Sequence, residues 1–277
     1  MNLHTIKEVR RPAAADEIAQ WRTGYAWLAG GTWLFSEPQL ATDTLIDLER
    51  LAWPPLSRVA NGLEIAATCT IADLYHFAEP TEWTAAGLFQ ECSNALLASF
   101  KIWNAATVGG NICMSLPAGA MIALTVALEA SYTLWPRGAP AREVAAVDFV
   151  TGNHANILQQ GELLRRIHLP TAALTKRYAM RRVSLTQYGR SAALIIGTQD
   201  RTARDLLLTI TAATPHPVQL RFDRFPSALE LRRAIDESLP IDGFFGDVHG
   251  SAAYKRHLTY HLSERIRCEL AEPEIAQ

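Results

Sequence analysis

Leu28-Ala29-Gly30-Gly31-Thr32-Trp33-Leu34 is the stretch that decides the fold, and a second glycine pair follows roughly eighty residues later in Thr107-Val108-Gly109-Gly110-Asn111. A Gly-Gly pair lets the backbone turn with positive φ and approach a ligand with no Cβ in the way. Successive backbone N–H groups in such turns form an anion-binding concavity, and Thr and Asn beside them add hydroxyl and amide contacts. We expect two such loops, meeting in space, to hold the two phosphates of a dinucleotide.

The composition is that of a globular chain, with 277 residues, 49% of them hydrophobic, and a formal net charge of −2. This length suffices for two or three compact lobes. The near-neutral charge gives no electrostatic reason to expect nucleic acid or an anionic membrane as a partner. The basic residues near the N-terminus precede no signal-peptide core, and the longest apolar stretch, at about 121–130, is shorter than the ~20 residues of a membrane helix. We therefore expect a soluble, cytoplasmic protein.

The metal-binding residue types are scattered. The chain contains four cysteines, Cys69, Cys92, Cys113 and Cys268. None forms a Cys-x-x-Cys pair, so we expect reduced, mostly buried thiols and no iron–sulfur cluster in this chain. His257 and His261 lie four apart on a predicted helix and could share a face as metal ligands. No acidic or Cys partner falls at a matching spacing, so we predict surface histidines and no metal site.

Apolar runs and turn residues divide the chain into three segments, at about residues 1–55, 56–170 and 171–277. In the first segment the predicted elements are a polar helix at 14–22, a strand at 26–29, a helix at 34–40 and a strand at 45–48. Strand, helix and strand in this order suggest a small α/β lobe. The Trp53-Pro54-Pro55 cluster ends that lobe.

The second and third segments alternate strands and helices. In the second we predict strands at 62–67, 131–135 and 161–169, and helices that begin at 70 and span 88–100 and 120–130. Thr70 is the expected N-cap of the first of these helices, with Asp73 at its third position, and the apolar 120–130 run predicts a buried helix. In the third segment we predict strands at 191–197 and 206–211, and helices at 229–235 and 252–269.

Several motifs together resemble one family. They are Ala29-Gly30-Gly31-Thr32, Thr107-Val108-Gly109-Gly110-Asn111, Ala127-Leu128-Glu129-Ala130, Glu162-Leu163-Leu164 with Leu169-Pro170, Tyr178-Ala179-Met180-Arg181, and Gly250-Ser251-Ala252-Ala253-Tyr254-Lys255. In this order they resemble the FAD-binding medium subunit of the molybdenum hydroxylases, the xanthine dehydrogenase and carbon monoxide dehydrogenase family. The resemblance implies an α+β fold, with a two-lobed FAD-binding domain of the PCMH type followed by a C-terminal α+β domain of antiparallel sheet and helices.

The resemblance also implies which residues hold the cofactor. The first loop, Leu28, Ala29, Gly30, Gly31, Thr32, Trp33 and Leu34, would wrap the FAD pyrophosphate, with Thr32 towards the flavin. The second loop, Thr107, Val108, Gly109, Gly110 and Asn111, would contact the phosphates and ribityl chain from the other side. Leu163 matches a position packed near the cofactor. Arg177 matches a basic position near the isoalloxazine, where a cation would stabilise the negative charge of reduced flavin; its alternative is a solvated strand charge.

Three positions depart from the family pattern. Many relatives carry an Asp that holds FAD where this chain has Ala120, and many carry Arg where it has Trp103. Trp33 stands where Asp or Ser is common, so its ring could cover a ring face or fill a core gap. These changes leave the expected fold intact and bear on how tightly FAD binds.

The function implied by the resemblance is electron transfer. Electrons would pass from [2Fe-2S] clusters on a small partner subunit to FAD on this chain, and from there to NAD or another acceptor. The molybdenum-pterin cofactor would lie on a large partner subunit, in a dimer of heterotrimers, and no catalytic acid or base is assigned here. No Gly-x-Gly-x-x-Gly occurs, which disfavours a Rossmann-type NAD site. Two alternatives stay open: a stand-alone flavin oxidoreductase, and a scaffold subunit that has lost FAD.

Overall fold

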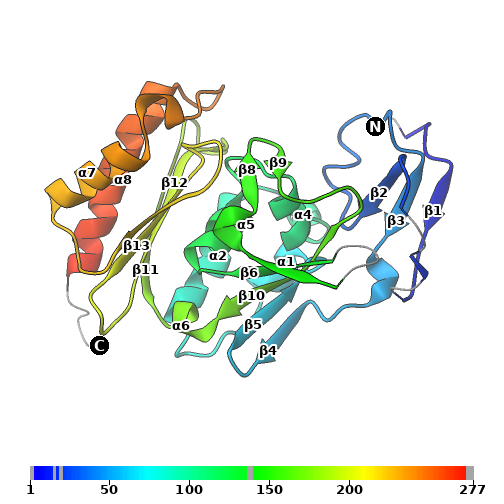
Figure 1. The fold of residues 1–277 in the computed structure, drawn as a ribbon, viewed down its shortest axis with the longest axis horizontal. Coiled ribbons are helices and arrows are strands. Elements are labelled where there is room, and N and C mark those ends of the chain that lie inside the picture. The colour runs from blue at the N-terminus through cyan, green and yellow to red at the C-terminus, as the bar shows by residue number, and fades with distance from the viewer. Residues whose placement is uncertain (1–2, 15–16, 19–20, 136–139, 273–277) are drawn as a thin grey trace.

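The computed structural model describes residues 3–14, 17–18, 21–135 and 140–272. Three sheets of three or more strands follow one another along the long axis of the molecule (Figure 1). One of these larger sheets lies within each of the segments 1–55, 56–170 and 171–277. The chain is therefore α+β, as the sequence predicts, while the independence of the three segments as domains stays a prediction.

The N-terminal lobe is a parallel sheet. Its strands are β1 (Glu8–Arg10), β2 (Tyr25–Leu28) and β3 (Thr44–Asp47), in the order β1-β3-β2. The central strand β3 is buried at every residue, including the polar Thr44 and Asp47 at its two ends. The predicted helix at 34–40 is wrong, because residues 32–36 form only a turn. Pro38 disfavours helical backbone at the residue before it and so stops the turn from extending. The predicted helix at 14–22 lies partly outside the described residues.

The second lobe carries a five-stranded antiparallel sheet in the order β4-β5-β10-β6-β7. Its strands are β4 (Leu56–Val59), β5 (Gly62–Ala66), β6 (Ser131–Trp135), β7 (Arg142–Ala145) and β10 (Leu163–Pro170), with a small hairpin of β8 (Val150–Gly152) and β9 (Ala155–Asn156). Its helices are α1 (Ile71–Tyr75), α2 (Leu88–Ala95), α3 (Phe100–Trp103), α4 (Val108–Cys113) and α5 (Ala120–Ala127). Thr70 and Asp73 form the predicted capping box of α1.

Two predicted helices of this lobe differ from the observed ones. The helix expected at 88–100 breaks after α2, because Leu97 takes a positive φ of 50° and the chain restarts as α3. The helix expected at 120–130 ends at Ala127 as α5, and each of its residues is buried. Leu194, Ile196 and Ala212 of the C-terminal sheet belong to the same core as α5. This two-sided packing explains why the run carries no polar face.

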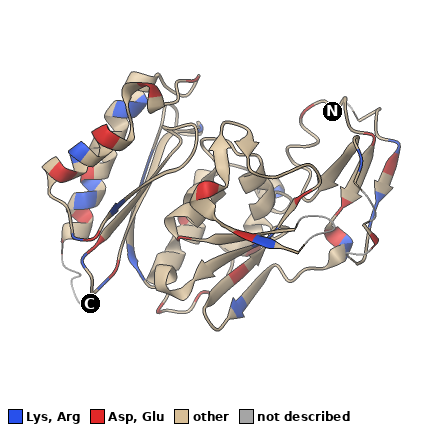
Figure 2. Cartoon of the chain, in the orientation of Figure 1, with Lys and Arg blue, Asp and Glu red and all other residues tan. Residues whose placement is uncertain are grey.

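The C-terminal segment is an antiparallel sheet covered on one face by two helices. It begins with α6 (Thr171–Leu174) and contains β11 (Arg177–Ser184), β12 (Ser191–Gln199), β13 (Leu206–Thr211), β14 (Val218–Phe222), α7 (Ala228–Ser238) and α8 (Ala252–Ala271). The two long helices lie on the outer face of the sheet (Figure 1), and many of their residues are charged (Figure 2). Single 3-10 turns span η2 (Glu49–Leu51), η3 (Thr84–Gly87), η4 (Ala146–Asp148) and η5 (Ile241–Gly243).

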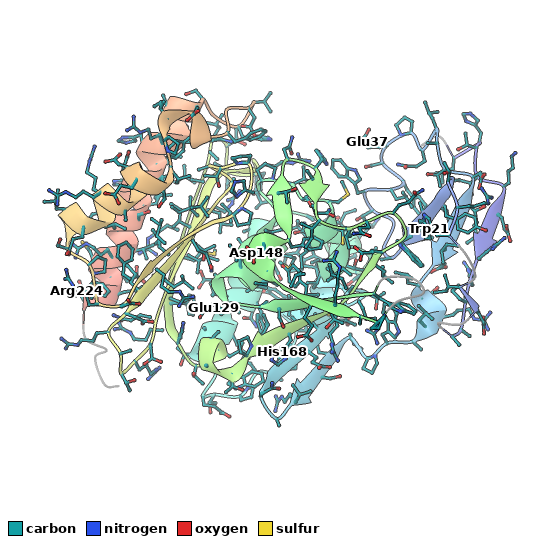
Figure 3. The ribbon with its side chains drawn as sticks, in the orientation of Figure 1. Trp21, Glu37, Glu129, Asp148, His168 and Arg224 are labelled. Carbon is teal, nitrogen blue, oxygen red and sulfur yellow. The ribbon has the colours of Figure 1, made fainter. Side chains whose placement is uncertain are left out.

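Glu129 joins the second lobe to the C-terminal sheet. Its carboxylate accepts hydrogen bonds from Lys176 Nζ at 2.5 Å and from an Arg221 guanidinium nitrogen at 2.5 Å. Glu129 lies where the green second lobe meets the yellow strands (Figure 3). A further bond from Gln219 Nε2 to the carbonyl oxygen of Val126, 2.8 Å long, tethers β14 to α5. The C-terminal sheet is thus held in a defined place against the second lobe.

Candidate functional site

A cavity of about 860 Å³ lies where the segments meet, within the size range of cofactor and ligand sites. Its wall includes residues 27–34 of the N-terminal lobe and both ends of α4. The second lobe adds the turn of the β8–β9 hairpin, Leu163, and residues 95–98 and 116–119, among others. The C-terminal segment adds Tyr188, Arg190, Ser191, Phe245, Asp247, Val248 and His249. Of the residues predicted to bind the cofactor, Val108 and Arg177 do not line this cavity and the others do.

The first glycine loop has the unpaired backbone donors of an anion site. Strand β2 ends at Leu28, and no hydrogen bond within the described residues uses the N–H groups of residues 30–34. Gly31 has a φ of +69°, the left-handed backbone that glycine adopts without strain. A Cβ on Gly30 would lie 1.7 Å from the carbonyl oxygen of Ala105. The loop therefore fits closely against the chain leading to α4 and offers five successive N–H groups to a ligand.

The second glycine pair works differently from the prediction. Gly109 and Gly110 lie inside α4 without positive φ, so the expected Gly-Gly turn is wrong here. The N–H groups of residues 108 and 109 donate to the carbonyl oxygens of Cys69 and Ala67, and the next two donate to Thr107. The second segment is thus a capped helix whose first-turn donors are already used, and it cannot add an anion nest.

Close packing explains the glycines of α4. A Cβ on Gly109 would lie 2.7 Å from both Cα and the carbonyl oxygen of Ala67, so only glycine lets α4 approach β5 this closely. A Cβ on Gly110 would lie 2.7 Å from Oγ1 of Thr107, the atom that caps the helix. Asn111 Oδ1 accepts a hydrogen bond from the Met121 N–H at 3.1 Å. This bond fixes α4 to the start of α5 beside the cavity.

The acidic groups of the cavity wall are paired. Arg142 donates two hydrogen bonds to the buried Glu162 carboxylate, at 3.0 and 2.7 Å, and they hold the pKa of Glu162 below its ordinary value. Asp247 accepts a 2.9 Å ion pair from Lys255, which is fully buried. Burial raises the pKa of the Cys113 thiol to about 12, so this wall residue is a neutral thiol. Such a wall adds little net negative charge near a bound phosphate.

Arg190 is the one cation that reaches the cavity from the described part of the chain. It is exposed, on the β11–β12 loop, and no ion pair of its guanidinium is found among the described residues. Arg182 braces this loop by donating to Ser191 Oγ at 2.8 Å and to the carbonyl oxygen of Gly189. Arg177, which the resemblance places near the flavin, instead donates to the carbonyl oxygens of Leu270 and Glu272 at the end of α8.

The positions that depart from the family pattern lie outside the cavity wall, apart from Trp33. Ala120 is buried in the first turn of α5, behind the wall residue Gly119. Trp103 packs on Tyr75, with ring centroids 4.9 Å apart. The wall residues that sequence reasoning missed include Asn153, His154, Tyr188, Arg190, Phe245, Asp247, Val248 and His249. For Phe245, Asp247, Val248 and His249, the neighbouring Gly250-Ser251 motif was a possible signal. The sequence around the other missed residues carries no recognisable motif.

The donor set fits FAD. Five successive N–H groups without an acceptor suit a pyrophosphate, and the missing Cβ of Gly30 lets the loop that carries them pack against the backbone of Ala105. The apolar share of the wall, including Leu28, Leu163 and Phe245, suits aromatic ring systems. No helix in the described ranges has the length and apolarity to cross a bilayer.

Comparisons with known proteins agree with this fit. Residues 5–172 match the family model of the FAD binding domain in molybdopterin dehydrogenase. The chain is 29% identical over 151 residues to the caffeine dehydrogenase subunit beta of Pseudomonas sp. (strain CBB1); the match covers 53% of this chain and half the length of that curated relative.

Solved structures share the fold. A carbon monoxide dehydrogenase chain from Hydrogenophaga pseudoflava superposes with a TM-score of 0.79 and 20% identity, covering 94% of this chain and 96% of that one. A quinoline 2-oxidoreductase chain from Pseudomonas putida 86 gives 0.77 and 18%, covering 95% of each. Because the family model spans more than half of the sequence, the chain belongs to the FAD-binding domain family of the molybdopterin dehydrogenases.

Proposed function

We propose that this chain is the FAD-carrying, electron-transfer subunit of a molybdenum hydroxylase. It would take electrons from [2Fe-2S] clusters on a partner subunit and pass them to NAD or another acceptor. The observation that carries the proposal is the run of unpaired N–H groups at residues 30–34, in a cavity of about 860 Å³ within a domain of this family. Bound FAD would supply the redox chemistry, and the chain would bind and orient it.

Each part of the wall has a role in this proposal. The N–H groups of residues 30–34 have no acceptor among the described residues, and they would donate hydrogen bonds to the charged oxygens of the pyrophosphate. The Arg142–Glu162 and Lys255–Asp247 pairs keep carboxylate charge from opposing the anion. Leu163 and the other apolar side chains would exclude water from the ring systems. Arg190 would favour the negative charge that reduction adds to the flavin.

An apolar rim beside the cavity supports a protein partner. We define this rim as Leu97, Phe100, Ile102, Tyr188 and Val248, which expose 37%, 71%, 40%, 81% and 88% of their surface. All but Phe100 also line the cavity. Exposed apolar side chains gathered around a site are typical of interaction surfaces. We propose that the small [2Fe-2S] subunit covers this rim and that a large molybdopterin subunit completes a cytoplasmic dimer of heterotrimers.

The visible absorption spectrum of the purified full-length chain, with the released cofactor identified by mass, tests the proposal. Flavin bands and the mass of FAD are expected. Rapid reduction of that flavin by a reduced [2Fe-2S] protein would favour the electron-transfer subunit. Rapid reduction by a small organic substrate with no partner present would favour a stand-alone flavin oxidoreductase. A colourless chain that takes up no added FAD would leave the scaffold alternative. The structure gives that alternative no support from Ala120, since its side chain lies behind the cavity wall.

A further inference from the structure

A β-bulge places two consecutive arginines on the outer face of the second-lobe sheet. The pairing of β10 with β6 shifts register between Leu164 and Arg166, so Arg165 is the extra residue. Leu164 and Ile167 are buried in the core that the sheet shares with the helices, whereas Arg165 and Arg166 between them are half-buried. Bulges of this kind commonly re-aim a side chain. Both guanidinium groups therefore lie on the face of the sheet opposite the helices.

The two arginines differ in what balances their charge. Arg166 forms an ion pair with Glu64 at 2.9 Å and donates to Thr133 Oγ1 at 3.3 Å. The Arg165 guanidinium has neither an ion pair nor a hydrogen bond to any residue that the structure describes. The segment 136–139, which follows β6 outside the described ranges, contains no acidic residue. Burial, and then the charge of Arg166, lower the pKa of Arg165, as expected for a cation without a counter-ion.

A pair of tryptophans supports the Arg165 side chain. Its guanidinium carbon lies 3.7 Å from the centroid of the Trp53 ring, in a cation–π contact. Trp53 in turn meets Trp135 edge-on, with ring centroids 6.4 Å apart and ring planes at 66°. We name Trp53, Trp135 and Arg165 the Trp–Arg patch, and all three are half-buried. The stack occupies the flat face of the guanidinium and leaves its N–H edge for a carboxylate, which a guanidinium binds with two parallel hydrogen bonds.

The composition of the patch is that of a protein-binding hot spot. Trp and Arg are enriched among the side chains that dominate the energy of protein interfaces. A half-buried cation without an acceptor is a cost to the isolated chain, because its N–H groups have lost water and gained no partner. The neighbouring Arg166–Glu64 and Arg142–Glu162 pairs are already balanced. The charge of the patch therefore specifies an acidic partner surface.

We propose that the Trp–Arg patch docks an acidic segment of the large molybdopterin subunit, with a carboxylate of that subunit bound to Arg165. The inference rests on the proposed function, in which the [2Fe-2S] subunit covers the apolar rim. That rim includes residues 97–102 on the helical side of the second lobe, whereas Arg165 lies on the opposite face of the sheet. The two surfaces thus face different directions and leave room for two partners.

The variant Arg165→Met tests the inference in the full-length, FAD-loaded chain. Methionine is long and apolar enough to stay on the Trp53 ring, so flavin content and thermal unfolding should match the wild type. Binding is measured at low and high salt between the immobilised chain and the large subunit, which is recovered from the wild-type complex and identified by its molybdenum content. We expect the dissociation constant to rise about thirtyfold, as for a hot-spot residue, and its salt dependence to weaken.

Arg166→Met is the matched control, because this arginine already has an acidic partner in its own chain and should affect binding only slightly. Arg165→Lys keeps the charge without the planar fork, so it should recover only part of the affinity. Wild-type binding by Arg165→Met would overturn the inference. A loss of stability in that variant would overturn it as well, since the side chain would then serve the fold. A wild-type chain that holds no flavin would instead refute the proposed function itself.

Discussion

At the scale of single residues, Gly30 shows how little space the cofactor loop leaves. Its missing Cβ would lie 1.7 Å from the carbonyl oxygen of Ala105, a backbone atom that cannot rotate away. We expect Gly30→Ala to push the 30–34 loop away from the segment at Ala105. This should lower the free energy of unfolding by about 1–3 kcal/mol and abolish FAD retention. Thermal unfolding and flavin content measure both effects. Gly243→Ala is the control, because its Cβ would meet no atom closer than 3.5 Å.

Arg190 supplies a second prediction at this scale. A guanidinium in the cavity would stabilise the additional negative charge of reduced flavin, so Arg190→Met should lower the reduction potential of bound FAD. Arg190→Lys keeps the positive charge and should leave the potential close to that of the wild type. Each tenfold change in a two-electron equilibrium corresponds to about 30 mV, which spectroelectrochemistry resolves. Arg177→Met makes the comparison, because that side chain bonds to the end of α8. A lower potential in Arg177→Met alone would restore the sequence-based assignment of Arg177.

At the scale of elements, α8 holds a loop of the cavity wall through a single buried charge. Lys255 Nζ donates to Asp247 Oδ1 at 2.9 Å and to the carbonyl oxygen of Ala212 at 3.1 Å. The same Asp247 oxygen accepts a hydrogen bond from the N–H of His249, so one carboxylate shapes the 245–249 loop, which carries the wall residues Phe245, Asp247, Val248 and His249.

Removing this charge should loosen the wall. We expect Lys255→Met to leave Asp247 without its partner and to cost about 3–5 kcal/mol of unfolding free energy, measured by urea denaturation. FAD affinity should fall as well, because the 245–249 loop loses its anchor. Arg256→Met is the control on the same helix, since Arg256 pairs with Asp236 and Tyr260 away from the cavity. Equal losses in both variants would contradict a specific role for Lys255.

Elements were predictable from sequence where local signals agreed with burial. The Thr70–Asp73 capping box, the buried β3 and the wholly apolar α5 each follow from a local pattern. The breaks were not predictable in this way. Leu97 takes a positive φ, although leucine does not favour this conformation, so the sequence gives no signal for the turn. The turn at 32–36 does not extend into the predicted helix.

The geometry of the candidate site was half predictable. The first glycine pair has the positive φ and the unpaired N–H groups that the sequence predicts, and its role in binding stays a prediction. Gly109 and Gly110 look the same in sequence but serve helix packing and capping. Tyr188 and Arg190 reach the cavity only through the placement of the C-terminal sheet, which is a long-range property of the fold.

At the scale of the whole molecule, the ion pairs of Glu129 set that placement. Burial raises the pKa of Glu129, but the hydrogen bonds from Lys176 and Arg221 outweigh it, and the net pKa in the folded chain is lowered. The carboxylate therefore stabilises the fold fully above its unfolded pKa of about 4.3, and the stabilisation disappears as the pH falls through the lower folded value. We expect Glu129→Gln to be less stable than the wild type at pH 7, with the difference shrinking as the pH falls below the unfolded pKa of about 4.3 and disappearing once the pH has passed the lower folded value. Unfolding free energies measured across this range check the prediction, and a difference independent of pH would contradict it.

The central claim is that residues 30–34 bind the FAD pyrophosphate through their backbone N–H groups. The most direct test is an amide ¹H–¹⁵N correlation spectrum of the labelled, cofactor-free chain during titration with FAD. The account predicts large shifts for the amides of residues 30–34, which have no acceptor within the described protein, and small shifts for residues 108–111, which are already bonded. Large shifts confined to residues 108–111, with residues 30–34 unmoved, would contradict it.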